Sequence, residues 1–518
     1  MRGVCNRDMV VTLGTGPLTD NELIRIARHG EAIQLDASAV DNVGATRVAI
    51  EALANDPDPH YGISTGFGAL ATTFIPEDQR AQLQRSLIRS HAAGTGPEIE
   101  TEVIRGLMVQ RLSTLMTGRT GVRAVVVETY AAVLNAGLTP IVYEYGSLGC
   151  SGDLAPLAHC ALVLMGEGRV RNSNGNVLDS ADALATAGIT PVELREKEGL
   201  ALINGTDGMT AMLLLAIEDM RHLLRVADIA LSISVEGLLA TDKVFADDLM
   251  ALRPHPGQRA AASNVRALLS GSPLVASHAG PEDPRVQDAY SIRCAPQVHG
   301  AARDTVDHAE RVARLELASA IDNPVVTLDY RVESNGNFHG APVGYVLDFL
   351  AIAAADVASM SERRTDRFLD PTRSYGLPPF LAHEAGVDSG LMIAQYTAAG
   401  IVSEMKRLAV PASVDSIPSS AMQEDHVSMG WAAGRKLRRA MDGLSRVLAI
   451  EILTACRGVA LRDAQASAAT GPIIDLVNAA SGGPGADRFL SPEIDTVVAL
   501  VQSGQILAAA EKTTGTLN

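Results

Sequence analysis

The sequence predicts a mainly α-helical protein, with a large helical bundle and a smaller N-terminal domain that holds a few short strands. Aromatic residues make up only 3% of the 518 residues, and Ala, Leu and Val dominate. This balance suits close helix packing better than a sheet core, which favours aromatic and β-branched side chains. After Gly434, apolar residues recur at helical spacing, with charged residues on the other faces. These apolar positions are Leu437, Met441, Leu444 and Leu448.

The first helix is expected to begin after Thr19. Glu22 follows Thr19 by three residues, which is the spacing of a capping box that satisfies the first N–H groups of a helix. Strand signals are few. The clearest covers residues 169–178, where an Asn-Gly pair can supply the positive φ angles of a tight hairpin turn. Another short pair of strands is expected within residues 325–332.

Two domains are expected, an N-terminal domain over residues 1–205 and an elongated central helical bundle over residues 206–518. No linker rich in Pro, Gly or Ser and no internal repeat marks a sharper boundary. The most apolar later segment, residues 344–360, contains Asp348 and Asp356. Because burying two carboxylates in a bilayer is costly, this segment predicts a buried helix and no membrane association.

Charge and cysteine usage narrow the class of protein further. The net charge of −17 argues against nucleic-acid binding, which needs a positive field. The apolar stretch at residues 9–13 is too short for a signal peptide. A sparse, odd set of cysteines without a CxxC pair fits a reducing cytoplasm, where we expect the protein to be located. The five cysteines are Cys5, Cys150, Cys160, Cys294 and Cys456.

Two common motifs are incomplete. Gly14 and Gly16 begin a dinucleotide-binding pattern, but Thr19 occupies the place of its third glycine. The sequence around Ser151 approaches a hydrolase nucleophile elbow, but Asp153 replaces the required glycine. With no P-loop or metal-binding pattern either, we expect neither a nucleotide nor a metal cofactor.

Residues 145–159 carry the most specific motif, Tyr-Gly-Ser-Leu-Gly-Cys-Ser-Gly-Asp-Leu-Ala-Pro-Leu-Ala-His. The motif resembles the signature of the aromatic amino acid ammonia-lyase family. That resemblance implies that Cys150, Ser151 and Gly152 cyclise without help into 4-methylidene-imidazol-5-one (MIO), an electrophile that ordinary side chains cannot supply. Gly152 offers an unhindered amide nitrogen for ring closure, and Ser151 loses its hydroxyl as water. The family usually has alanine where this chain has Cys150, but only the backbone carbonyl of that residue enters the ring.

Three further blocks resemble the part of the family's site that holds the reacting groups. Residues 61–68 are similar to a mobile inner loop, which implies that Tyr61 is a general base for the β-proton. Asn204, in an Asn-Gly-Thr block, is implied to contact the electrophile and the substrate amine. Phe338 is implied to pack beside the electrophile. Asp207 stands where many histidine-specific members have glutamine.

Two positions resemble the histidine-specific members of the family. Ser90 and His91 occupy the selectivity position, where phenylalanine and tyrosine lyases usually carry Phe-Leu or His-Leu. His91 can hydrogen-bond a substrate imidazole that an apolar pocket would leave without partners. Glu424 stands where histidine-specific members place a glutamate, and its carboxylate can hold the imidazole N–H or receive the ammonium proton.

Residues 286–294 resemble a core block of the family's active site. Arg293 is implied to bind the substrate carboxylate, because its planar guanidinium can reach both oxygens at once. Tyr290 is implied to assist proton transfer near the electrophile. Gln287 is implied to add a hydrogen bond.

Together these resemblances imply a lyase that converts L-histidine to trans-urocanate and ammonia, the first step of histidine degradation. They also imply a homotetramer whose sites are built from more than one chain. A tyrosine or phenylalanine lyase, an aminomutase of the same family and an inactive helical scaffold remain alternatives. The sequence leaves open whether Tyr61 or Tyr290 is the base, and whether the electrophile attacks the amine or the imidazole.

Overall fold

The computed structural model describes residues 10–280, 283 and 286–518, so that Cys5 lies outside the described residues. The chain groups into two compact units. The first unit contains the chain up to residue 215 together with residues 310–348 and 411–435. The second contains residues 216–309, 349–410 and 436–518. Each unit is thus made of several chain segments, and the domain boundary expected near residue 205 stays a prediction.

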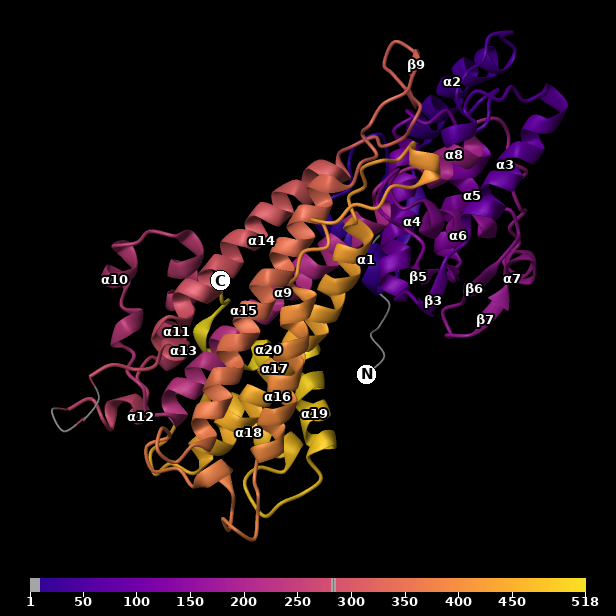
Figure 1. The fold of residues 1–518 in the computed structure, drawn as a ribbon. Helices are drawn as coiled ribbons and strands as arrows, with labels where there is room; N and C mark the ends of the chain where they lie inside the picture. Colours follow the sequence, from indigo (N-terminus) through magenta and orange to yellow (C-terminus); the bar gives the residue numbers. More distant parts are fainter. Residues whose placement is uncertain (1–9, 281–282, 284–285) are drawn as a thin grey trace. The chain divides into compact units, whose positions relative to one another are not determined.

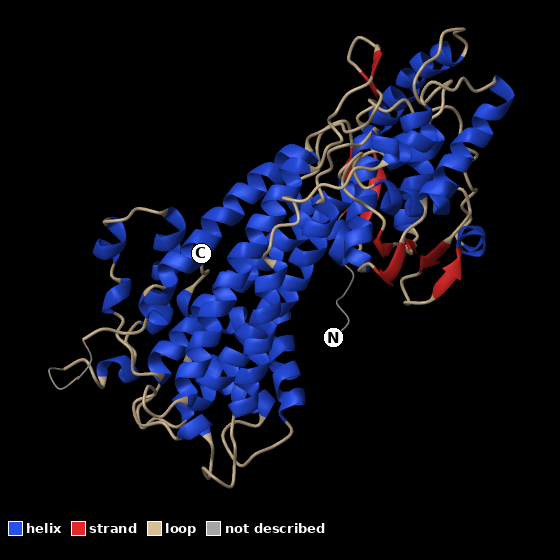
Figure 2. Cartoon of the chain, viewed as in Figure 1, coloured by secondary structure: helices blue, strands red, loops and turns tan. Residues whose placement is uncertain are grey.

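Helices dominate the described residues, which form 20 α-helices (Figure 1) and nine short strands (Figure 2), as the sequence predicts. The helices of the first unit are α1 (Asp20–His29), α2 (Ala37–Ala54), α3 (Glu77–His91), α4 (Thr101–Met116), α5 (Ala124–Asn135), α6 (Leu154–Leu164), α7 (Ser180–Thr186) and α8 (Glu198–Ile203). Its strands are β1 (Val10–Leu13), β2 (Ala32–Leu35), β3 (Thr95–Glu98), β4 (Thr139–Pro140), β5 (Tyr143–Tyr145), β6 (Arg169–Arg171), β7 (Val177–Asp179), β8 (Val325–Val326) and β9 (Val332–Glu333).

Four of the five boundaries between the two units in sequence fall inside long helices. These helices are α9 (Asp207–Gly237), α14 (Ala295–Leu317), α15 (Ala341–Leu369) and α17 (Gly430–Ala460). The remaining helices belong to the second unit: α10 (Asp247–Ala251), α11 (Pro256–Leu269), α12 (Pro273–Ala276), α13 (Tyr290–Arg293), α16 (Met392–Leu408), α18 (Gly471–Ser481), α19 (Leu490–Gln502) and α20 (Gln505–Thr514). Short 3-10 turns, η1 to η4, cover Gly68–Leu70, Lys243–Phe245, Pro379–Leu381 and Ser420–Met422.

The local sequence signals are confirmed. Helix α1 begins with a complete capping box, in which the backbone N–H of Glu22 donates to Thr19 Oγ1 at 3.2 Å. Strands β6 and β7 form the expected antiparallel hairpin, and Gly175 in its turn has a φ of +84°. Strands β8 and β9 form the second expected pair. The apolar stripe beginning at Leu437 is buried on α17.

The first unit is built around α4, whose residues from Val103 to Met116 are all buried. Helices α1 and α5 pack against it, and α3, α6 and α8 pack against one another. Arg111 on α4 is fully buried and donates to Asp207 Oδ2 from Nε at 3.0 Å and from Nη2 at 2.5 Å. Its Nη1 atom donates to the backbone carbonyls of Ala201 and Ile321. A single buried guanidinium therefore joins α4 to α8, to the first residue of α9 and to the segment that precedes Asn323.

The second unit has a helical core with its own buried ion pair. Arg364 and Glu451 are both fully buried, and Arg364 Nε donates to Glu451 Oε1 at 2.5 Å. In the described part of the chain, one helix, α15, is long and apolar enough to cross a membrane. Within its most apolar stretch, 61% is buried inside the protein. This burial agrees with the core helix expected over residues 344–360.

Candidate active site

A cavity of about 570 Å³ lies in the first unit and collects five of the residues predicted to form the site. These five are Tyr61, His91, Ser151, Asn204 and Glu424. Its other lining residues are Gly66, Phe67, Gly68, Ala69, Leu70, Thr73, Ile75, Leu83, Ser86, Leu87, Ser90, Leu154, Leu200, Ile203, Asn323 and Ser420. Most of the wall is apolar, so the few polar groups converge on a small part of the space.

The Cys-Ser-Gly tripeptide is held against the segment after α8. Gly152 has a φ of +73°, and a Cβ at this position would come within 2.0 Å of the Gly205 carbonyl oxygen. Only glycine fits such a close approach between two backbones. On the other side of the contact, the Asp153 N–H donates to the same Gly205 oxygen at 2.7 Å.

The residues that precede the tripeptide are also fixed. Ser428 Oγ donates to the Gly149 carbonyl at 2.7 Å, and the Met429 N–H donates to the Leu148 carbonyl at 2.8 Å. The two ends of the tripeptide are thus anchored by different chain segments, while Gly152 carries no side chain that would hinder its amide nitrogen. This arrangement fits the ring closure that MIO requires.

Asp153 follows the tripeptide and is fully buried. Its carboxylate accepts hydrogen bonds from the Met209 N–H at 2.9 Å and from Ser147 Oγ at 3.0 Å. Burial raises the pKa of Asp153 to about 7, although these hydrogen bonds partly oppose the rise. Asp153 therefore ties α9 to the turn before the tripeptide instead of capping α6.

Glu424 has a different set of partners at each of its two oxygens. Oε2 accepts hydrogen bonds from Ser419 Oγ at 2.7 Å and from Cys150 Sγ at 3.1 Å. Oε1 accepts a hydrogen bond from Ser151 Oγ at 3.2 Å. Burial and the nearby Glu424 charge raise the pKa of the Cys150 thiol to about 12. The thiol is therefore a hydrogen-bond donor at neutral pH and not a competing nucleophile.

His91 is the last residue of α3 and presents a neutral imidazole to the cavity. Its Nδ1 atom lies 2.9 Å from the Leu87 carbonyl oxygen. Because a carbonyl can only accept, Nδ1 carries the proton and Nε2 is the acceptor. Burial lowers the pKa of His91, an effect that the Leu87 carbonyl and Glu424 partly oppose.

Tyr61 belongs to the segment between α2 and α3. Its hydroxyl oxygen accepts a hydrogen bond from the Gly68 N–H at 3.2 Å, and its ring meets Phe67 edge to face. Arg80 closes the two ends of this segment, because it donates to the backbone carbonyls of Ala54 and Ile75. The base of the segment is therefore fixed to two helices.

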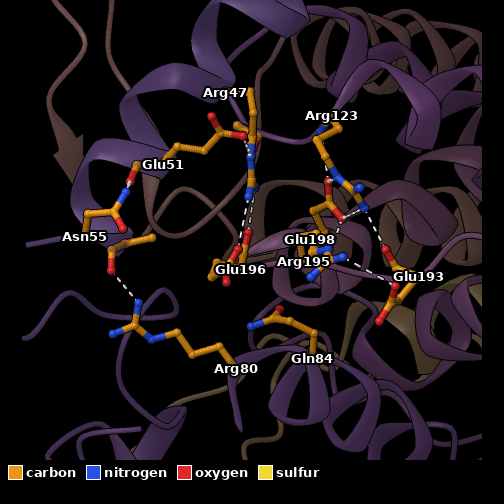
Figure 3. Close-up of polar contacts among 12 residues, drawn as sticks. Arg47, Glu51, Asn55, Arg80, Gln84, Arg123, Glu193, Arg195, Glu196 and Glu198 are labelled. Atoms are coloured by element: carbon orange, nitrogen blue, oxygen red, sulfur yellow. Dashed lines mark hydrogen bonds and ion pairs between the residues drawn. The ribbon is translucent and has the colours of Figure 1, made fainter. Parts of the chain in front are cut away.

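Two ion pairs, each with one buried partner, hold the chain that leads into α8. The Arg47 guanidinium donates to both the carboxylate and the backbone carbonyl of Glu196 (Figure 3). Arg123 makes a bidentate pair with Glu198, at 2.8 Å from each of two nitrogens. These contacts fix α8 and hence the position of Asn204, which immediately follows it.

Asn204 has one satisfied and one unsatisfied polar atom. Its Nδ2 donates to the Asn323 carbonyl at 3.2 Å. Its buried Oδ1 has no hydrogen-bond partner among the described residues. An acceptor left open in a cavity is suited to a ligand that brings its own N–H group. Asp207, by contrast, is occupied by Arg111 and has a structural role.

The remaining predicted residues do not line this cavity. Gln287, Tyr290 and Arg293 belong to the second unit, where Gln287 lines a separate cavity of about 390 Å³. The Tyr290 side chain is 69% exposed, and the Arg293 guanidinium lies 4.5 Å from its ring centroid. Phe338 is half-buried in the first unit but is not part of the cavity wall.

Sequence reasoning missed two polar contributors to the site. Ser419 binds the Glu424 carboxylate, and the Asn323 carbonyl binds Asn204. Neither residue belongs to a block that resembles the family motif. Both contacts depend on how distant or tightly turned segments meet, which residue spacing does not reveal.

Comparisons with known proteins agree with this geometry. Residues 18–479 match the family model for aromatic amino acid lyases. A histidine ammonia-lyase from Streptomyces griseus is 60% identical over 511 residues, covering 98% of this chain and 99% of that protein. One from Sorangium cellulosum is 48% identical, covering 97% of this chain and 99% of that protein.

Solved structures show the same fold. A tyrosine aminomutase from Streptomyces globisporus matches with a TM-score of 0.92 at 35% identity, covering 98% of this chain and all of that chain. A histidine ammonia-lyase from Trypanosoma cruzi matches with a TM-score of 0.89 at 39% identity, covering 98% and 96% of the two chains. The class of this protein is thus that of the carbon–nitrogen lyases. More specifically, the chain belongs to the aromatic amino acid lyase family.

The raised pKa of Asp153 predicts a pH-dependent stability. Because the folded protein holds this proton up to about pH 7, the contribution of Asp153 to stability is fully present below its usual pKa of 3.8 and is lost as the pH rises through 7. Asp153→Asn should therefore gain stability relative to the unsubstituted protein between pH 5 and pH 8, by at most roughly 3 kcal/mol. Thermal unfolding at both pH values measures this gain.

Asp41→Asn, at an exposed position, controls for the change in net charge. An equal difference in unfolding temperature between the Asp153→Asn variant and the unsubstituted protein at both pH values would contradict the assignment.

Proposed function

We propose that this enzyme eliminates ammonia from L-histidine to give trans-urocanate, the first step of histidine degradation. The observation that carries the proposal is that His91 and the Glu424 carboxylate line the same cavity as Ser151. The relatives named histidine ammonia-lyase, which match nearly the whole chain at up to 60% identity, support it.

The two polar side chains suit an imidazole better than a phenyl ring. A neutral imidazole has one N–H donor and one ring nitrogen acceptor. His91 Nε2 and Glu424 Oε1 are both acceptors, and the imidazole N–H can donate to one of them. A benzene ring brings no ring N–H, so it would leave these partly buried groups without a partner.

We also propose that Cys150, Ser151 and Gly152 form MIO. When formed, the group supplies an electrophilic carbon that ordinary side chains lack. The anchoring of Gly149 by Ser428 and the close approach of Gly152 to Gly205 would hold it. These contacts also keep the reactive carbon at the wall of the cavity.

The surrounding residues can bind the amine and remove a proton. The unsatisfied Asn204 Oδ1 can accept a hydrogen from the substrate ammonium. Tyr61 is our candidate for the base that takes the β-proton. The Gly68 N–H donates to its hydroxyl oxygen and so helps to hold the Tyr61 side chain at the cavity wall.

The complete site is proposed to need a second copy of the chain in a cytoplasmic homotetramer. Gln287, Tyr290 and Arg293 do not line the cavity of the first unit. The exposed Tyr290 is available to another copy. In that arrangement Arg293 would bind the substrate carboxylate, Gln287 would add a hydrogen bond, and Tyr290 would stand as the alternative base.

Ser151→Ala should fold normally but lose nearly all turnover, on the order of a thousandfold or more, because it cannot form the methylidene carbon. Cys150→Ala should keep substantial activity, because only the backbone carbonyl of this residue enters the ring. The absorbance of urocanate measures both rates, and cyanide should inactivate the unsubstituted enzyme by trapping its electrophile. Full activity in Ser151→Ala would overturn the proposal.

Glu424→Gln should lower kcat/KM for histidine by about tenfold or more, because a charge-assisted hydrogen bond to the imidazole is lost. Any activity toward tyrosine should change much less. Product analysis with histidine, tyrosine and phenylalanine measures the ratio, with the exposed Glu128→Gln as the control. An unsubstituted enzyme that prefers tyrosine, or that returns a β-amino acid, would favour the aminomutase alternative.

A further inference from the structure

The two oxygens of the Glu424 carboxylate have different numbers of hydrogen-bond donors. The family resemblance assigns no role to this difference. Ser419 and Cys150 both donate to Oε2, at 2.7 Å and 3.1 Å, whereas Ser151 alone donates to Oε1, at 3.2 Å. We infer that Ser419 and Cys150 are positioning residues that fix Oε2 of Glu424, so that Oε1 is presented to the substrate imidazole. This inference rests on the proposed function.

Ser419 is locked opposite Glu424 by backbone pairing as well as by its hydroxyl. The Ser419 N–H donates to the Glu424 carbonyl at 3.0 Å, and the Glu424 N–H donates to the Ser419 carbonyl at 3.3 Å. The chain between them turns through Ser420, Ala421 and Met422, whose φ angles are +52°, +52° and +71°. This left-handed conformation is strained for residues that carry a side chain. Such strain persists where the surrounding structure enforces a particular geometry.

Formation of the electrophile removes the hydroxyl of Ser151, which is the donor to Glu424 Oε1. The hydroxyl leaves as water, so Oε1 then loses its donor. Oε2 keeps both Ser419 and Cys150, since neither side chain takes part in the ring closure. Formation of the electrophile therefore also opens one oxygen of the carboxylate to the substrate.

Cys150 contributes a donor that the usual alanine at this position cannot supply. Its thiol is buried beside Glu424 and stays protonated near neutral pH, so it can donate to the carboxylate. A thiol is a weaker donor than a hydroxyl. Ser419 should therefore contribute more than Cys150 to holding the carboxylate.

The test uses Ser151→Ala as its background, because this variant lacks the hydroxyl just as the matured loop does and binds substrate without turning it over. Calorimetry measures the affinity for L-histidine. Adding Ser419→Ala should weaken binding by about tenfold, and adding Cys150→Ala by about threefold. Cys150→Ser should retain the affinity, because it keeps a donor at the same position.

The matched controls are Cys160→Ala and Ser413→Ala. Cys160 is a buried cysteine on α6. Ser413 binds Asp348 through its backbone N–H, which the substitution keeps. Both should leave histidine affinity unchanged. In the enzyme with Ser151 intact, Ser419→Ala should raise KM for histidine more than it lowers kcat.

The outcomes separate this inference from the proposed function. If the unsubstituted enzyme makes urocanate but Ser419→Ala and Cys150→Ala leave the affinity and the KM for histidine unchanged, the inference is overturned and the proposed function stands. If the unsubstituted enzyme makes no urocanate from histidine, both are overturned. A loss of thermal stability in Ser419→Ala with unchanged histidine affinity would mean a structural role only and would also overturn it.

Discussion

The contact between the backbones of Gly152 and Gly205 is the constraint on which the rest of the site depends. A single Cβ on Gly152 would stand 2.0 Å from the Gly205 carbonyl oxygen, so no other residue can occupy this place. The contact joins the start of α6 to the segment between α8 and α9. It therefore places Ser151 and Asn204, which flank that contact, on the wall of one cavity.

Buried charge keeps this contact in place. Arg111 and Asp207 form a fully buried pair directly beside Gly205, and a Cβ on Gly205 would overlap the Arg111 guanidinium. Breaking a buried pair by removing one partner typically costs about 3–5 kcal/mol, which is roughly a fifth or more of the stability of an ordinary domain. Asp207, which stands where many histidine-specific members of the family have glutamine, thus stabilises the site through Arg111 without lining the cavity. The polar atoms that do face the cavity stay available for substrate.

Much of the local structure and part of the site could be predicted from sequence, for different physical reasons. The capping box at Thr19 and the hairpin over residues 169–178 depend on neighbouring residues, so spacing alone reveals them. The cavity residues come from distant segments, and only the family resemblance brought Tyr61 and Glu424 together. Ser419 escaped prediction because its contact requires a left-handed turn through residues that are not glycine.

The central claim is that the tripeptide becomes an electrophile, and the mass of the peptide that contains residues 150–152 tests it most directly. Ring closure and loss of the Ser151 hydroxyl should each remove one water. Mass spectrometry of that peptide from active enzyme should therefore find it lighter than its sequence mass by two waters. An uncyclised mass for this peptide in enzyme that converts histidine to urocanate would contradict the account.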